Sequence, residues 1–178
     1  MSVLSFFCRA REFRQRLEAS RDRLYRVAYS WCHEPWLADD LVQLTLEKAL
    51  SRSAQLRELE KLDGWLFSIL HHCWMDHLRR NRPMVDIDEI PQVEEITPQD
   101  VCHESEIIDR VRQAVAGLPI GQRQVLTLVD LEGFSYNEVA AILDIPVGTV
   151  MSRLNRARRA LMAPLLDLKP HIRLVKVK

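Results

Sequence analysis

The chain of 178 residues is 47% hydrophobic, carries a formal net charge of zero and has a mean hydropathy of −0.16, a composition that excludes a disordered chain. No stretch approaches the ~18 apolar residues that a membrane-spanning helix needs, and the amino terminus lacks the features of a signal peptide. We therefore expect a cytoplasmic protein with no direct membrane insertion. Its four cysteines form no CxxC pair and are expected to be free thiols.

The neutral total hides blocks of opposite charge. Residues 83–109 hold nine acidic side chains and no lysine or arginine, whereas residues 145–166 hold four arginines and no acid. The first 26 residues add seven arginines against three acids. Basic blocks of this kind favour a polyanionic partner.

Hydrophobic periodicity predicts an almost entirely helical chain, with strand-like alternation absent except in the last few residues. The expected helices are Arg9–His33, Pro35–Ser51, Asp63–Arg82, His103–Gly117, Ile120–Glu132, Ser135–Leu143 and Val147–Leu166. The predicted fold class is all-α, with two small helical domains joined by an acidic flexible linker and a helix-turn-helix in the second domain.

The domain boundary is placed after the third expected helix. Pro83 ends that helix, because proline lacks a backbone donor and disfavours a helical residue before it. Pro91 and Pro98 keep the acidic segment extended, and its composition is typical of a linker. The alternative is a surface loop packed on one domain. The predicted division is 9–82, linker 83–102, and 103–168.

The second domain carries the sequence pattern of a helix-turn-helix. Ser135 is suited to cap a helix, and Glu138 stands at the spacing of a capping box. Asp144 tolerates the left-handed conformation that commonly ends a helix, and a second helix begins near Val147. Two short helices joined by a tight turn, the second of them basic, indicate DNA binding.

A helical wheel gives the second helix a buried face and a polar face. Val150, Leu154, Ala157 and Leu161 form the buried stripe. The opposite face carries groups that bind bases or phosphates, with Met151 at its edge. The predicted DNA-binding residues are Thr149, Ser152, Arg153, Asn155, Arg156, Arg158 and Arg159. The alternative is an amphipathic surface helix whose arginines are only solvated.

Three strings here, LPIGQRQVL at 118–126, EGFSYNEVA at 132–140 and IPVGTVMSRLNRAR at 145–158, resemble region 4 of extracytoplasmic-function (ECF) sigma factors. The resemblance implies binding to the −35 promoter element through the second helix, and docking on the flap of the polymerase beta subunit. Met151 replaces a residue that is usually basic, which implies an altered −35 preference or a weaker grip on phosphate. Asp144 replaces a frequent glycine and implies a small backbone strain.

The string DDLVQLTLEKA at 39–49 places Asp40, Gln43 and Glu47 on one helix face. By itself this face would be interpreted as solvated surface. The string also resembles the region 2 helix of the same family, which binds the clamp helices of the polymerase beta-prime subunit. The resemblance implies that these three residues contact core RNA polymerase, although Leu44 stands where the family usually has an acid.

The string DGWLFSILHHCWMDHLRR at 63–80 resembles the helix that opens and reads the −10 element. Melting DNA needs apolar surfaces that replace stacking and cations that hold the separated strand. The expected −10 contacts are His71, His72, Arg79 and Arg80. Trp65 and Trp74 are expected in the core. The segment Ser51–Leu62 matches the place where the family captures a flipped base.

Other functions are weaker interpretations of the sequence. His71, His72, Cys73 and His77 cluster, but zinc needs a complete set of three or four ligands, so we expect neither a metal nor another cofactor. No nucleophile–base set predicts an enzyme. A different DNA-binding regulator, such as a response-regulator output domain, would leave the strings at 39–49 and 63–80 unexplained. The resemblance implies three partners: core RNA polymerase, promoter DNA and an anti-sigma factor.

Overall fold

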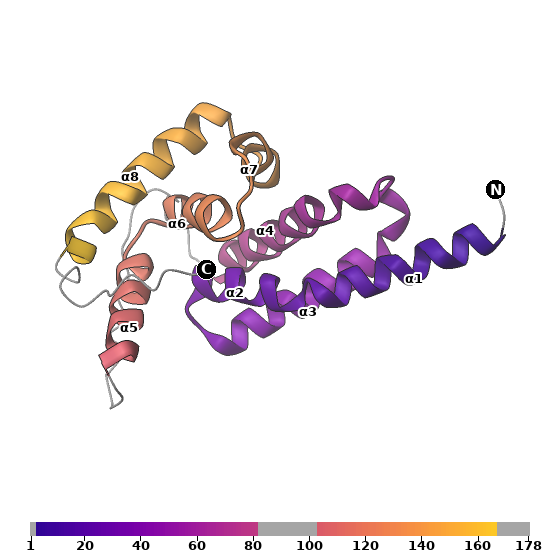
Figure 1. Ribbon diagram of the computed structural model, residues 1–178, viewed down its shortest axis with the longest axis horizontal. Helices are drawn as coiled ribbons and strands as arrows, with labels where there is room; N and C mark the ends of the chain where they lie inside the picture. Colours follow the sequence, from indigo (N-terminus) through magenta and orange to yellow (C-terminus); the bar gives the residue numbers. More distant parts are fainter. Residues whose placement is uncertain (1–2, 82–102, 167–178) are drawn as a thin grey trace, which may run out of the picture.

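The computed structural model describes the backbone of residues 3–81 and 103–166 and the side chains of residues 10–81 and 110–162. Within these ranges the chain is helical and contains no strand, which confirms the all-α prediction. The helices form two bundles that lie side by side (Figure 1). The predicted acidic linker 83–102 and the end of the predicted third helix at Arg82 lie outside the described residues.

The first bundle consists of α1 (Val3–Ala19), α2 (Arg21–Cys32), α3 (Pro35–Ser51) and α4 (Leu62–Asn81). The prediction of one continuous helix from Arg9 to His33 is wrong, because α1 and α2 are separate helices that meet at Ser20. The buried Ser20 hydroxyl donates a hydrogen bond to the Arg16 carbonyl at 2.8 Å. Such a bond to the preceding turn often bends a helix.

The core of the first bundle is built from large apolar side chains of α2, α3 and α4. Leu24, Trp31, Leu41 and Phe67 are each at most 1% exposed. Burial of a side chain of this size contributes about 1.5–3 kcal/mol. Trp74 is also buried, as predicted, whereas Trp65 is half-buried at the margin of the core.

The second bundle consists of α5 (His103–Ala116), α6 (Ile120–Leu126), α7 (Tyr136–Leu143) and α8 (Val147–Leu166). The expected α-helix to Glu132 is also wrong in part, because Thr127–Leu131 forms a π-helical turn after α6. The Glu132 amide therefore bonds to the Thr127 carbonyl, five residues back, at 3.1 Å. Gly133 follows with φ of 75°, a conformation that suits glycine.

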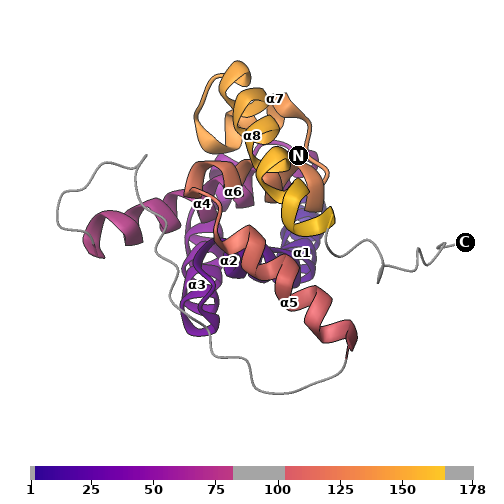
Figure 2. The same cartoon turned by 90° about the vertical axis from the view of Figure 1, so that its left-hand side faces the viewer.

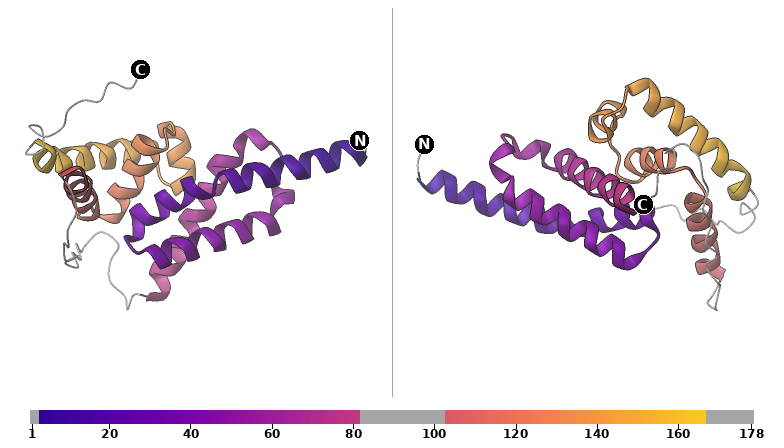
Figure 3. Two further views of the ribbon diagram at one scale, coloured as in Figure 1. Left: turned by 60° about the horizontal axis from the view of Figure 1, so that its bottom comes forward. Right: turned by 180° about the vertical axis from the view of Figure 1, so that it is seen from behind.

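The two bundles contact each other through a defined set of helices. Figure 1 shows α6 and α7 lying against the first bundle, with α8 on the far side of them. Seen after a quarter turn and from behind, the second bundle still lies against the first (Figures 2 and 3), and α7 is the helix of the second bundle that contacts α4. The element that carries the predicted −35 residues therefore lies away from the first bundle.

Candidate nucleic-acid interface

The helix-turn-helix forms as the sequence predicts. The Ser135 hydroxyl accepts a hydrogen bond from the Glu138 amide, and the Glu138 carboxylate accepts one from the Ser135 amide at 2.8 Å. Asp144 ends α7 in the left-handed conformation with φ of 52°. The inner stripe of α8 is buried, with Val150, Leu154, Ala157 and Leu161 no more than 8% exposed. These packing contacts fix which side of α8 faces outward.

The outward side of α8 carries a polar stripe. Ser152, Asn155, Arg156 and Arg159 are all exposed, and Met151 is 53% exposed beside them. Thr149 is half-buried at the edge of the stripe. Guanidinium, amide and hydroxyl groups can donate to phosphates and to base edges in the major groove. The exposed groups on this side of α8 are therefore of the chemical types that bind DNA.

Two of the predicted DNA-binding arginines also hold α8 in place. Arg158 forms an ion pair with Asp130 of the π-helical turn, with Nη2 and Oδ1 2.6 Å apart, and its bonds to Asp130 raise the pKa of Arg158. Arg153 is half-buried and lies against Gly121, where an added Cβ would stand 2.8 Å from Nη1 of Arg153. Sequence reasoning missed Asp130 because 28 residues separate it from Arg158.

The predicted polymerase-binding face of α3 is open. Asp40, Gln43 and Glu47 are exposed, and Nε2 of Gln43 lies 3.4 Å from Oε1 of Glu47. Trp36, one helical turn before Asp40, is 81% exposed. Sequence reasoning missed Trp36, although an aromatic residue one turn before a polar face is a signal for a binding hot spot.

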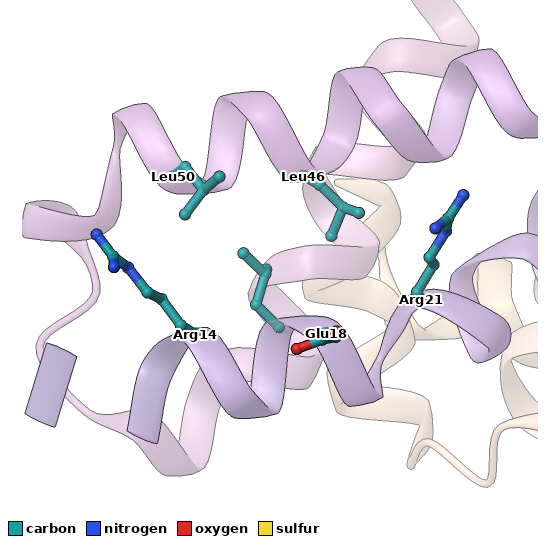
Figure 4. A pocket seen from close by; sticks show the side chains of 6 residues that line it. Arg14, Glu18, Arg21, Leu46 and Leu50 are labelled. Carbon is teal, nitrogen blue, oxygen red and sulfur yellow. The ribbon is translucent and has the colours of Figure 1, made fainter. Parts of the chain in front are cut away.

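A groove borders this face between α1 and α3 (Figure 4). Leu46 and Leu50 of α3 form one wall, and Arg14 and Arg21 stand at its two ends. Its volume is about 390 Å³. Since Leu46 and Leu50 stand three residues after Gln43 and Glu47, the groove continues the exposed surface of α3.

The predicted −10 residues of α4 do not form one surface. His72, Arg79 and Arg80 are exposed, and Arg79 pairs with Asp76 at 3.0 Å. His71 instead faces the second bundle, where its Nδ1 lies 3.1 Å from Nε2 of Gln124. Burial lowers the pKa of His71 to about 4. His71 is therefore covered in this arrangement, whereas the other three predicted residues are exposed to solvent.

The cysteine–histidine cluster on α4 does not assemble into a metal site. Among the residues that the structure describes, no group of three or more His, Cys, Asp or Glu side chains is placed to hold a metal ion. His77 stacks on Trp74 with ring centroids 5.8 Å apart, and Cys73 is buried. Cys32 and Cys73 are free thiols, as predicted; the side chains of Cys8 and Cys102 lie outside the described part.

The fold and the α8 face define a class of protein. The second bundle is a helix-turn-helix DNA-binding domain, and a second helical domain with its own exposed faces accompanies it. No helix in residues 3–81 or 103–166 is long and apolar enough to cross a membrane.

Comparison with known proteins gives the family. Residues 17–83 match the family model for Sigma-70 region 2, and residues 108–161 match that for Sigma-70, region 4. The ECF RNA polymerase sigma factor EcfG of Rhodopseudomonas palustris is 39% identical over 128 residues, which cover 71% of this chain and 70% of EcfG. The chain belongs to the ECF RNA polymerase sigma factors, a family of transcription initiation factors.

Two further relatives agree with this assignment. The ECF sigma factor SigE of Mycolicibacterium smegmatis is 34% identical over 146 residues, which cover 79% of this chain but only 56% of SigE. The solved structure of the sigma factor RpoE from Bartonella quintana, in complex with the anti-sigma factor NepR, is 30% identical. It superposes with a TM-score of 0.72 and covers 87% of this chain and 97% of the RpoE chain.

Proposed function

We propose that this chain binds core RNA polymerase and directs it to promoters whose −35 element is read by α8. The observation that carries the proposal is the outward stripe of Ser152, Asn155, Arg156 and Arg159 on a capped helix-turn-helix. Thr149, Arg153 and Arg158 complete the proposed −35 contacts at its margins. Base-edge pairing by arginine and asparagine gives the sequence preference, and the remaining arginines bind phosphate.

The first bundle supplies the other two activities of the proposed factor. Asp40, Gln43 and Glu47 contact basic residues of the beta-prime clamp helices, because the acidic face is exposed and lies beside the apolar groove. Arg79 and Arg80, together with the histidines at 71 and 72, bind the separated −10 strand. Region 2 is assigned to residues 9–82 and region 4 to residues 103–168.

Control by an anti-sigma factor is part of the same proposal. It is supported by RpoE, the similar structure that was solved with the anti-sigma factor NepR. The factor works in the cytoplasm, where its polymerase partner is, and it contributes binding rather than catalysis. A transcription assay with purified core polymerase tests the whole proposal. Transcripts from a cognate promoter should appear when this chain is added and should be absent with core polymerase alone. A chain that does not co-elute with core polymerase in gel filtration would refute it.

Replacing Arg156 by alanine is expected to reduce transcription from the cognate promoter about 5- to 150-fold, because a direct contact to a base is worth roughly 1–3 kcal/mol. The measurement is run-off transcription beside a binding assay with core polymerase, which should be unchanged. Arg26→Ala removes the same charge from an exposed position on α2 in the first bundle and serves as the control. Equal activity of Arg156→Ala and the wild type would remove Arg156 from the proposed contacts.

The double replacement Asp40→Arg with Gln43→Ala is expected to weaken binding to core polymerase at least tenfold, because it reverses the charge of a face proposed to meet basic residues. Pull-down of the beta-prime subunit measures this. Asp39→Arg is the matched control, since Asp39 is exposed on the same helix but points about 100° away from Asp40. A double variant that binds as well as Asp39→Arg would contradict the assignment.

A further inference from the structure

Met151 is a large apolar side chain on the polar side of α8. It is 53% exposed, whereas its neighbours on the inner stripe, Val150 and Leu154, are at most 2% exposed. Asn155, one helical turn further on, is exposed as well and points about 40° from Met151. Because Met151 is not part of the hydrophobic core, folding does not account for an apolar group at this position. Isolated apolar side chains are common on protein surfaces, so the place of Met151 on the helix decides what it can bind.

The place of Met151 is the part of a helix-turn-helix that meets base edges. The second helix of this motif lies in the major groove, and residues near its amino-terminal end contact the bases. Met151 stands one turn after Val147, where α8 begins. Val147 is on the same side of the helix and is 36% exposed, so an apolar edge runs along the first turns of α8. Since α6 and α7 lie between α8 and the first bundle, this edge faces solvent (Figure 1).

A methionine in this position has one apolar target on the DNA. Base edges in the major groove present hydrogen-bond acceptors, amino donors and the C5-methyl group of thymine, which is the only apolar group among them. The thioether is at most a weak acceptor and carries no charge, so Met151 gains little from a phosphate or from a polar base edge. Methionine is unbranched and flexible, so it can follow an irregular apolar surface. Contact with a thymine methyl is therefore what makes removal of Met151 from water favourable.

The other side chains of the outward stripe are suited to different base groups. The Ser152 hydroxyl donates to the Thr149 carbonyl at 3.1 Å, so its oxygen is left as an acceptor for the amino group of adenine or cytosine. The Asn155 amide suits adenine, and the Arg156 guanidinium suits guanine. Thr149 has a methyl group, but it is half-buried and points about 160° from Met151. Met151 is thus the side chain at this edge of α8 that can recognise a thymine by its methyl group.

Helix geometry sets the distance between the thymine and the base that Asn155 contacts. Met151 and Asn155 are one turn apart, or about 6 Å along the axis of α8. Successive base pairs of B-DNA are about 3.4 Å apart. The thymine therefore lies within about two base pairs of the adenine that suits Asn155.

We propose that Met151 determines part of the −35 specificity by packing on the C5-methyl group of a thymine near the base that Asn155 contacts. This inference rests on the proposed function of α8 as the helix that reads the −35 element. Cytosine at this position lacks the methyl group, and a purine places other groups there. Because the contact is apolar, it contributes to sequence preference without adding to the salt-dependent binding of phosphates.

Deoxyuridine tests the contact from the DNA side, because it differs from thymidine only by the missing C5-methyl group. The holoenzyme of the full-length chain with purified core polymerase first selects duplexes from a library whose randomised segment is long enough to span both promoter elements. In the duplex that is enriched most, each thymine of the upstream element is then replaced in turn by deoxyuridine. Competition against a labelled duplex gives the ratio of the two affinities.

With the wild-type chain, deoxyuridine at one thymine should weaken binding about three- to fivefold, the ratio expected for burial of one methyl-sized group. In Met151→Ala the thymine and deoxyuridine duplexes should bind almost equally, because alanine ends at Cβ and does not reach the methyl group. Binding of this variant to the thymine duplex should fall by a factor similar to the wild-type ratio. Since Met151 is exposed, the circular dichroism and melting temperature of Met151→Ala should stay the same.

Met162→Ala is the matched control. Met162 is also exposed on α8, at 59%, and points to within about 20° of Met151. It stands about three turns closer to the carboxyl end, roughly 16 Å along the helix, beyond the turns that contact bases. This variant should keep the full ratio between the thymine and deoxyuridine duplexes.

The outcomes separate the role of Met151 from the proposed function of α8. An upstream element without thymine, or equal binding of thymine and deoxyuridine at every position by the wild type, would overturn the role of Met151 and leave the reading of the −35 element by α8 in place. A ratio that persists in Met151→Ala would also overturn it, because another group or the shape of the DNA would then respond to the methyl group. If the holoenzyme forms but enriches no upstream element, the proposed function of α8 fails, and the role of Met151 fails with it.

Discussion

Replacing Arg123 by alanine is expected to lower the free energy of unfolding by about 3 kcal/mol or more. Its guanidinium donates to three backbone carbonyls, those of Trp31, Ala116 and Leu118, with the first at 2.7 Å and the last at 2.9 Å. A hydrogen bond from a charged group contributes about 1.5–3 kcal/mol, and buried acceptors left without a donor cost about 1–3 kcal/mol. Burial lowers the pKa of Arg123 to about 10, so the side chain is still a cation at neutral pH.

Urea unfolding of the full-length chain measures this loss. Arg159→Ala is the control, because it shortens an exposed arginine of α8 and should change stability by no more than about 0.5 kcal/mol. Arg123→Lys should recover only part of the loss, since an ammonium cannot reach three carbonyls with the planar fork of a guanidinium. A midpoint for Arg123→Ala equal to that of Arg159→Ala would show that the three carbonyl bonds contribute little.

Lowering the pH from 7.5 to 5 is expected to open the contact between the bundles. The pKa of His71 is lowered to about 4, mainly by burial and also by the neighbouring His72, while Asp144 at the end of α7 opposes the shift. Burial, with the positive charge of Arg123, likewise lowers the pKa of His33 to about 4. Both imidazoles are therefore neutral while the bundles touch, and protonation favours any state that exposes them.

The sign of the effect follows from the direction of the shift. A histidine whose pKa is near 6.5 when exposed and about 4 when covered takes up a proton on opening, so the closed state is fully stable above pH 6.5. Its stability then falls as the pH drops from 6.5 toward 4. At pH 5 the His71 contribution lost is on the order of 2 kcal/mol. His33 acts in the same direction with a smaller effect, because solvent screens it more.

X-ray scattering across this pH range checks the prediction, and His71→Asn identifies the group responsible. Asparagine keeps an acceptor for Gln124 but does not titrate, so the opening should shift to lower pH in this variant. His77→Asn changes a histidine on the same helix that stacks on Trp74, outside the contact, and should behave as the wild type. If His71→Asn opens at the same pH as the wild type, another group controls the transition.

Local sequence was enough to predict the helix-turn-helix. The capping box at Ser135 and Glu138, the left-handed Asp144 and the buried stripe of Val150 and Leu154 depend on residues at most four positions apart. Helical periodicity and capping act over that range, so they can be read along the chain without knowledge of the fold. The outward stripe of α8 follows from the same periodicity.

The predicted helix boundaries were wrong where a side-chain hydrogen bond or tertiary packing changed the backbone conformation locally. Ser20 is compatible with a helix, and its hydroxyl could form several different hydrogen bonds with nearby backbone groups. The sequence therefore does not show that it bonds to the Arg16 carbonyl. The π-helical turn Thr127–Leu131 carries no special residue type before Gly133. Propensity is a weak predictor here, because tertiary packing selects among backbone states that differ little in energy.

By itself, therefore, the sequence determined the helical content, the helix-turn-helix and the polar face of α8. Only the tertiary structure decided that Arg123 holds two helix ends together, that Asp130 pairs with Arg158 and that His71 lies beneath the second bundle. The decisive contacts across the bundles join residues 53 to 109 positions apart. Pairings at such separations depend on how two folded surfaces fit, and no local propensity encodes that fit.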